Sequence, residues 1–212
     1  MIKKLTLSIS LFICLTIFAS ANASEICLKI SASNSGQLTK ANCNNVWRDL
    51  ASTGAFPGVF SSPVREPMLY PLCYVSVAKF TATLTSKYGR EKEVLVSSKS
   101  AWTTDLEPFI LSPLAAPGSP YSPLSFEFND NTASIVSEWT IYDPNRNDRV
   151  IGKIYSMDIL DLIRSKEVTV IINGTGNYYR ARGSVVIESQ ATDMEFNTVE
   201  LTKISGTLCF QN

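Results

Sequence analysis

Residues 171–185 read Ile-Ile-Asn-Gly-Thr-Gly-Asn-Tyr-Tyr-Arg-Ala-Arg-Gly-Ser-Val. The two glycines around Thr175 permit the positive backbone angles of a tight reversal, so the stretch predicts two strands joined by a turn. Gly183 falls inside the returning strand, where glycine often marks a bulge or a close approach of two backbones. A phosphate-binding loop is disfavoured, because the spacing is not Gly-x-Gly-x-x-Gly and the pattern predicts no helix after it.

Strand-like runs extend from this turn in both directions, with alternating apolar side chains and many β-branched residues. The segment 158–166 is ambiguous between a helical turn and a strand end. With that segment left open, about eight short strands remain, and this number predicts a closed antiparallel barrel, which has no exposed sheet edges. The predicted strands are 73–85, 93–103, 124–128, 133–142, 150–157, 168–172, 178–189 and 199–210.

Asn173-Gly-Thr-Gly176, then Tyr178, then Ala181-Arg-Gly183 resembles the signature of the allene oxide cyclase and dirigent superfamily. The family usually has glycine where this chain has Asn173. The run from Gly152 to Asp158 is similar to a strand ending in Asp in bacterial members, and the resemblance covers residues 73–212. It implies an eight-stranded barrel with an apolar cavity, often trimeric. Members cyclise an oxylipin epoxide or direct the coupling of phenoxy radicals, but the shared motif belongs to the fold, which does not determine function.

Residues 1–23 have the pattern of a cleavable secretory signal peptide, with Lys3 and Lys4 before an apolar run and small residues at Ala19–Ala23. The apolar run is shorter than the roughly 20 residues of a membrane span, so an N-terminal anchor is the less favoured alternative. A lipoprotein using Cys14 is less favoured still. We expect a secreted or periplasmic protein, with no membrane span after cleavage.

The mature chain divides into an N-terminal extension and linker, residues 24–72, and a barrel, residues 73–212. A short helix is predicted at Asn45–Ala51, with Asn45 as its cap. Prolines cluster in 54–71 and 107–124, which are therefore predicted to be irregular. The second segment could cover a barrel mouth, contact another subunit or simply pack on the surface.

Four cysteines remain after signal cleavage, and an even number in an exported chain indicates two disulfides. We favour Cys27–Cys43, a local clip on the extension, and Cys73–Cys209, which would join the first and last core strands. A reactive thiol or metal site is disfavoured because no Cys-x-x-Cys is present.

The chain contains no histidine, which excludes the usual Ser-His-Asp and Cys-His hydrolases and histidine-ligated metal sites. The segment 143–148 has the spacing of a calcium loop only in part, since it lacks the required glycine and the final glutamate, and a hairpin loop is favoured. We expect no metal and no cofactor. The formal net charge of zero also argues against a nucleic-acid partner.

If any carboxylates face a cavity, the best candidates are Glu138, Asp158 and Glu188. Burial there would raise the pKa of each and suit it to acid–base chemistry. The alternative, favoured by strand alternation, is that each lies on the outer face of the barrel. Candidate ligand-binding residues are Trp139, Tyr142 and Arg182. Arg182 could pair with one of the acids, and Tyr142 could equally be a packing residue.

Three functions follow in order of preference. The first is an exported barrel that binds a small apolar or aromatic ligand without strong catalysis. The second is a secreted surface or interaction protein with a packed barrel, and the third is an isomerase or cyclase that uses a cavity carboxylate. The barrel interior distinguishes them, since an interior filled by Phe80, Trp102 and Trp139 would contradict both small-molecule functions. The family resemblance adds a homotrimer as an expected assembly.

Overall fold

The computed structural model describes residues 24–56, 72–103, 132–161, 164–192 and 197–211. The predicted signal peptide, the predicted strand 124–128 and the proline-rich segment 107–124 lie outside the described residues, as does most of 54–71. Side chains of a few strand residues, Trp102 among them, also lie outside the description.

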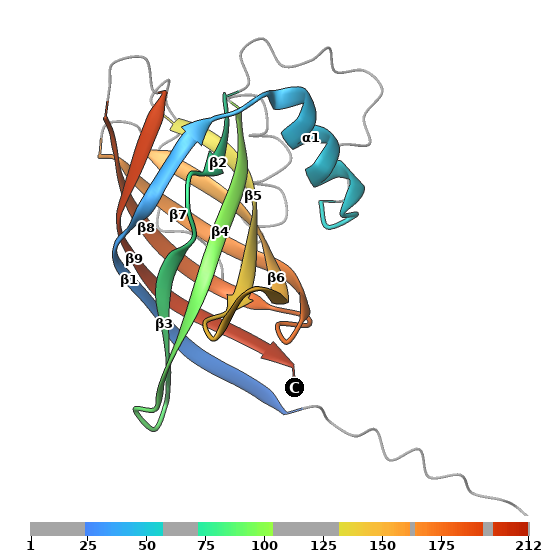
Figure 1. The fold of residues 1–212 in the computed structure, drawn as a ribbon, viewed down its shortest axis with the longest axis vertical. Helices are drawn as coiled ribbons and strands as arrows, with labels where there is room; N and C mark the ends of the chain where they lie inside the picture. The colour runs from blue at the N-terminus through green and yellow to red at the C-terminus, as the bar shows by residue number, and fades with distance from the viewer. Residues whose placement is uncertain (1–23, 57–71, 104–131, 162–163, 193–196, 212) are drawn as a thin grey trace, which may run out of the picture.

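Nine strands form a single antiparallel sheet, and this sheet closes into a barrel (Figure 1). Each predicted strand within the described residues is present, although most begin or end a few residues away from the predicted bounds. The strands are β1 (Glu25–Lys40), β2 (Leu72–Ser76), β3 (Phe80–Ser86), β4 (Glu91–Thr103), β5 (Thr132–Asp143), β6 (Arg146–Asp161), β7 (Lys166–Gly176), β8 (Arg182–Ala191) and β9 (Thr198–Gln211).

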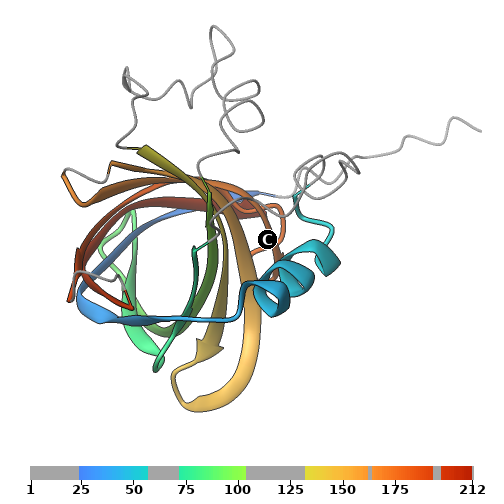
Figure 2. The same cartoon turned by 90° about the horizontal axis from the view of Figure 1, so that it is seen from above.

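The sheet closes because β1 pairs with β9 along most of its length and also with β2 and β3. β2 and β3 occupy one position in the sheet. β2 pairs with the end of β1 and the end of β4, while β3 pairs with the earlier part of each. Nine strand segments therefore fill eight positions, and the predicted eight-stranded closed antiparallel barrel is confirmed. Figure 2 shows the strands as a closed ring.

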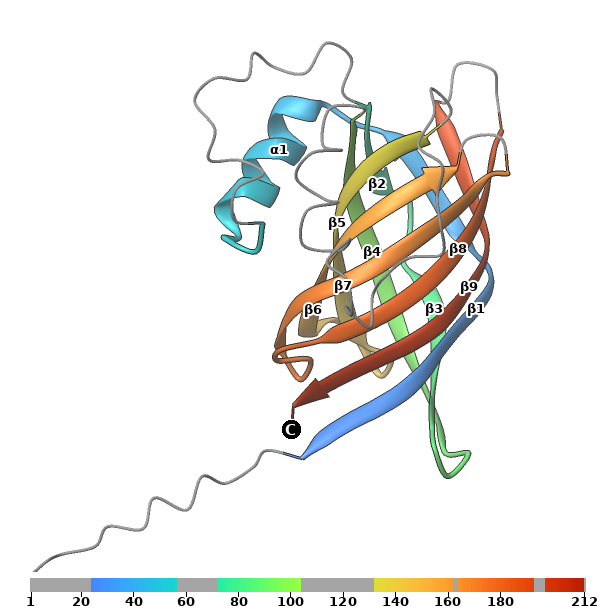
Figure 3. The ribbon, with the colours of Figure 1, turned by 180° about the vertical axis from the view of Figure 1, so that it is seen from behind.

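The predicted start of the barrel at residue 73 is wrong, since Glu25–Lys40 is a full barrel strand. Its apolar residues do alternate, and Leu28, Ile30 and Ala32 pack into the barrel. A register shift between Ser33 and Gly36 interrupts the alternation. Because the bulge breaks the period-2 pattern, the sequence pattern did not predict this strand. Figure 3 shows β1 beside β9, with the C-terminus next to the start of β1.

All four cysteines form disulfides as expected, but the predicted pairing is wrong. The bonds are Cys27–Cys209, with Cα atoms 4.0 Å apart, and Cys43–Cys73, with Cα atoms 5.2 Å apart. Cys27 lies in β1 directly opposite Cys209 in β9, at the closing seam. The local clip instead joins the start of the helix to β2. The pairing was predicted wrongly because β1 was not recognised as a barrel strand beside β9.

The predicted helix is present as α1 (Cys43–Ser52), and its N-cap is Asn42 rather than Asn45. The Asn42 side chain accepts a hydrogen bond from the Asn45 backbone N–H. Val46 and Leu50 are buried in a cluster with Ala101 and Val136 on the outer face of the barrel. The helix therefore lies outside the ring of strands, as Figure 2 shows.

A larger apolar cluster fills the barrel interior, and its largest fully buried members include Tyr74, Ile135, Ile154 and Leu208. The turn predicted from residues 173–177 falls slightly later, between Gly176 and Arg182. Gly183 has φ +143°, and a Cβ there would collide with the carbonyl oxygen of Thr207 on β9. The predicted close approach of two backbones at Gly183 is thus confirmed.

Candidate ligand site in the upper barrel

The upper end of the barrel, at the top of Figure 1, is the end where β1 finishes and β9 begins. Side chains alternate between the two faces of each strand, so every second residue of β4 to β7 points into the barrel. Toward the upper end several of these inward positions are polar on four neighbouring strands, although Ile135 and Leu160 in the same phase are apolar. The polar residues are Ser98 and Ser100 on β4, Ser137 on β5, Ser156 and Asp158 on β6, and Glu167 and Thr169 on β7.

Two acids are buried within this polar wall. Asp158 is fully buried, and its Oδ2 accepts hydrogen bonds from Ser137 Oγ at 2.8 Å and Ser156 Oγ at 3.3 Å. Glu167 Oε1 accepts a hydrogen bond from Thr169 Oγ1 at 3.0 Å. Among the described residues, Asp158 Oδ1 is buried and has no hydrogen-bond partner. Buried polar atoms are nearly always hydrogen-bonded, so this oxygen is an unusual feature.

Burial raises the pKa of Glu167 to about 7, against the opposing effect of hydrogen bonds from Thr169 and Asp158. Burial also raises the pKa of Asp158 well above its ordinary value, and the neighbouring charge of Glu167 adds to that shift. Hydrogen bonds from Ser137 and two other hydroxyls partly counteract it. The two acids therefore titrate as a coupled pair, and burial favours the protonated form of each.

A pocket lies between this polar wall and an apolar wall formed by β1, β3, β8 and β9. Its free volume is about 20 Å³, roughly the room that one water molecule needs. The apolar lining residues are Leu38, Phe80, Trp139, Ile187, Val199, Leu201 and Ile204, and the polar ones are Ser98, Ser100, Ser137, Glu167 and Ser189.

Of the three predicted acids, only Asp158 faces the interior. Glu138 lies on the outer face, where it is buried and pairs with Lys153 at 2.9 Å. Although partial burial disfavours the Lys153 ammonium, the hydrogen bond and charge of Glu138 raise the pKa of Lys153. Glu188 also lies on the outer face, with Lys203 Nζ 3.7 Å away. For Glu138 and Glu188 the alternative given above, a position on the outer face of the barrel, is therefore the correct one.

The predicted ligand-binding residues are not brought together. Trp139 is buried and lines the pocket. Tyr142 lies on the outer face, where its hydroxyl contacts Ser97 Oγ at 3.2 Å and Lys79 lies over its ring. Arg182 is exposed at the lower end and pairs with Glu25 through two hydrogen bonds.

The sequence pattern points to Asp158 but not to Glu167. The predicted strand begins at Val168, one residue too late, so Glu167 falls between that strand and the ambiguous segment 158–166 and is left without an assignment. The sequence does carry a signal, because Glu167, Thr169 and Ile171 alternate in the same phase and all point inward. The hydroxyls of Ser137 and Ser156 gave no such signal, since serine is common on either face of a strand.

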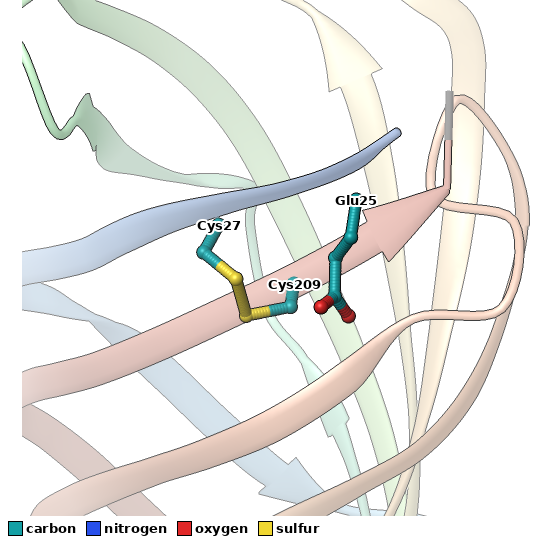
Figure 4. A group of neighbouring side chains, drawn as sticks. All are labelled: Glu25, Cys27 and Cys209. Atoms are coloured by element: carbon teal, nitrogen blue, oxygen red, sulfur yellow. A yellow bond between two sulfur atoms is a disulfide. The ribbon is translucent and has the colours of Figure 1, made fainter. Parts of the chain in front are cut away.

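Glu25, Cys27 and Cys209 bring potential metal-ligand atoms close together at the lower end (Figure 4). Both sulfur atoms belong to the disulfide, and Glu25 is paired with Arg182. Because only a free thiolate is a strong metal ligand, this group is not a metal site in the oxidised protein.

Among the described residues, no helix has the length and apolar character needed to cross a membrane. No family model matches the chain, and no curated protein matches it. The chain is similar in structure to two pterocarpan synthase dirigent proteins, GePTS1 and PsPTS1. Sequence identity is 9% and 12%, and the TM-scores are 0.38 and 0.37. Both alignments cover 89% of this chain, with 88% and 94% of the other chains. The comparison concerns the fold alone.

Proposed function

We propose that the chain is an exported barrel protein that binds a small molecule in the upper pocket, without strong catalysis. The observation that carries this proposal is the two-sided lining of the pocket. Six apolar side chains of β1, β3, β8 and β9 face the hydroxyls of β4 and β5 and the Glu167 carboxyl of β7, with Trp139 of β5 and Ser189 of β8 as the exceptions to this division. Such a lining matches a ligand with an apolar or aromatic body and one polar group. The two disulfides are consistent with an extracellular protein, and secretion or periplasmic export remains part of the proposal.

The two buried carboxyl groups of the polar wall lower the free energy of unfolding, and a purely structural role does not explain why they are there. Burying two carboxyl groups in a barrel that could be filled with apolar side chains destabilises the fold. A strongly perturbed, buried acid that lines a pocket is a typical mark of a functional site. Asp158 Oδ1 adds a buried polar atom without a partner among the described residues.

The packed barrel is the second candidate, and the small free volume favours it. A benzene-sized guest occupies a cavity of roughly 150 Å³, whereas the pocket offers about 20 Å³. Phe80 and Trp139 are both buried in the core, as a packed interior requires. Ligand binding in the upper pocket therefore requires lining side chains to rotate.

Methyl NMR distinguishes the two functions, with 2-phenylethanol as a neutral probe of the expected shape. We expect the methyl signals of Leu38, Leu201 and Ile204 to shift during the titration, because these side chains line the pocket. Signals of Leu84 and Val94, which are buried elsewhere in the interior, are the matched control and should not move. No shift up to the solubility limit of the probe, or equal shifts in both sets, would support the packed barrel instead.

A further inference from the structure

We propose that the polar group of the ligand is a protonated amine, so that the upper pocket selects small organic cations with an apolar body. This inference rests on the proposed function and specifies its ligand class. It begins from the charge balance of the interior. Two carboxyl groups lie there, and neither has a lysine or arginine partner among the ion pairs of the described residues.

The basic side chains near this part of the barrel point elsewhere. Lys99, Lys153 and Lys203 lie on the outer face, where each pairs with an acid. Lys166 alternates with the inward Glu167 and is exposed. Lys40 has the register of an inward residue, opposite Tyr74, but it is exposed at the end of β1 and does not line the pocket. Among the described residues the acid pair thus has hydroxyl partners and the hydrogen bond between Asp158 and Glu167, but no basic partner, so its charge is compensated by a proton or by a bound cation.

The unpartnered oxygen indicates where a donor is missing. Asp158 is fully buried, and hydroxyl donors occupy its Oδ2 while Oδ1 has none among the described residues. An ammonium group supplies three N–H donors and a positive charge. It can therefore bind the Glu167 carboxylate, which lines the pocket. Asp158 does not line the pocket, so the ammonium reaches its Oδ1 only if the lining side chains rotate. A charge-assisted hydrogen bond of this kind is stronger than one to a neutral alcohol.

The opposite wall favours an organic cation over a metal ion. Calcium takes six to eight oxygen ligands arranged around it. Here all the lining oxygen donors except Ser189 stand on one side, and Leu201, Ile204 and Phe80 stand on the other. An amine with an apolar body places its charge against the acids and its body against these side chains. Aromatic rings also attract cations, and Phe80 and Trp139 both line the pocket.

Calorimetric titration of two matched probes tests the inference. 2-Phenylethylamine and 2-phenylethanol have the same body and differ in one polar group. At slightly alkaline pH we expect the amine to bind at least about tenfold more tightly, the usual advantage of a hydrogen bond to a buried charge. Glu167→Gln should remove most of that preference. Glu188→Gln, the same substitution on the outer face, should retain it.

The remaining outcomes separate this inference from the proposed function. Equal affinity for amine and alcohol in the wild-type protein overturns the amine preference and leaves small-molecule binding in place. If neither probe binds, both proposals fail. Amine binding that does not respond to Glu167→Gln, or that leaves the pocket methyl signals unmoved, places the amine elsewhere and overturns the inference. Competition by calcium chloride would assign the acid pair to a metal ion and would also overturn it.

Discussion

At the scale of single residues, Glu167 makes stability depend on pH. Its pKa in the folded chain is about 7, against an ordinary value of 4.5. An acid whose pKa is raised by folding stabilises the fold fully below its unfolded pKa, and that contribution is lost as pH rises through the folded pKa. We therefore expect the free energy of unfolding to fall between about pH 5 and pH 8, by an amount on the order of 3 kcal/mol.

Urea unfolding across this pH range measures the effect. Glu167→Gln should reduce the dependence and leave the part that Asp158 contributes, since burial raises the pKa of Asp158 as well. Glu188→Gln on the outer face should leave the dependence unchanged. Glu25 and Asp49 have lowered pKa values, because of hydrogen bonds with Arg182 and Lys99 respectively, so their titration falls at more acidic pH. A Glu167→Gln protein with the full wild-type slope would show that Glu167 does not titrate in this range.

Gly183 provides a second prediction at the residue scale. A Cβ at this position meets the Thr207 carbonyl oxygen, and backbone atoms in a paired strand cannot move aside easily. We expect Gly183→Ala to lower the free energy of unfolding by about 3 kcal/mol or more. Gly89 has φ +76° and open space around it, so Gly89→Ala should cost only about 1 kcal/mol. Equal losses in the two variants would contradict the close approach of β8 and β9.

Alternation along the strands explains which site residues could be predicted. It gives Asp158 as a candidate for the interior, and the structure has Asp158 buried there, but the sequence does not state which of two phases points inward. Glu138 was therefore proposed for the interior, although it shares the outward phase of Val136. Local pattern also cannot show that Asp158 and Glu167, on neighbouring strands, lie close together, because that depends on the register of β6 and β7.

At the scale of elements, the seam between β1 and β9 is the least predictable part of the fold. It joins residues at opposite ends of the chain, and a bulge at Ser33–Gly36 breaks the pattern of β1. The disulfide Cys27–Cys209 lies in this seam and encloses a sequence separation of 182 residues. A wrong position for β1 was enough to produce a wrong disulfide pairing, even though the number of disulfides was predicted correctly.

Removal of the seam disulfide should strongly destabilise the barrel. In the chain-entropy model a loop of this length stabilises the fold by roughly 5 kcal/mol, so we expect a loss of that order in Cys27→Ala/Cys209→Ala. Ser31→Ala/Ser205→Ala changes another directly opposed pair of the same two strands and should cost less than about 1 kcal/mol. Urea unfolding compares them. A cysteine variant no less stable than the serine variant would contradict a constraining role for the seam disulfide.

At the scale of the whole molecule, the closed barrel was the most predictable feature. Eight strand positions in one antiparallel sheet leave few alternatives that avoid exposed edges. The sequence did not reveal that β2 and β3 share one position, since Cys73–Thr85 has a continuous alternating pattern. Nor did it reveal that the interior is packed along most of its length with a polar pocket at one end, because that follows from the tilt and stagger of all the strands together.

The central claim is that the acid-lined pocket opens to admit a ligand, and a crystal structure of the protein with 2-phenylethylamine tests it most directly. We expect the amine nitrogen within hydrogen-bond distance of the Glu167 carboxylate, the phenyl group against Leu201 and Ile204, and a pocket larger than the present 20 Å³ or so. An unchanged pocket, with the amine absent or bound on the outer face of the barrel, would contradict the claim and favour a barrel whose interior serves packing alone.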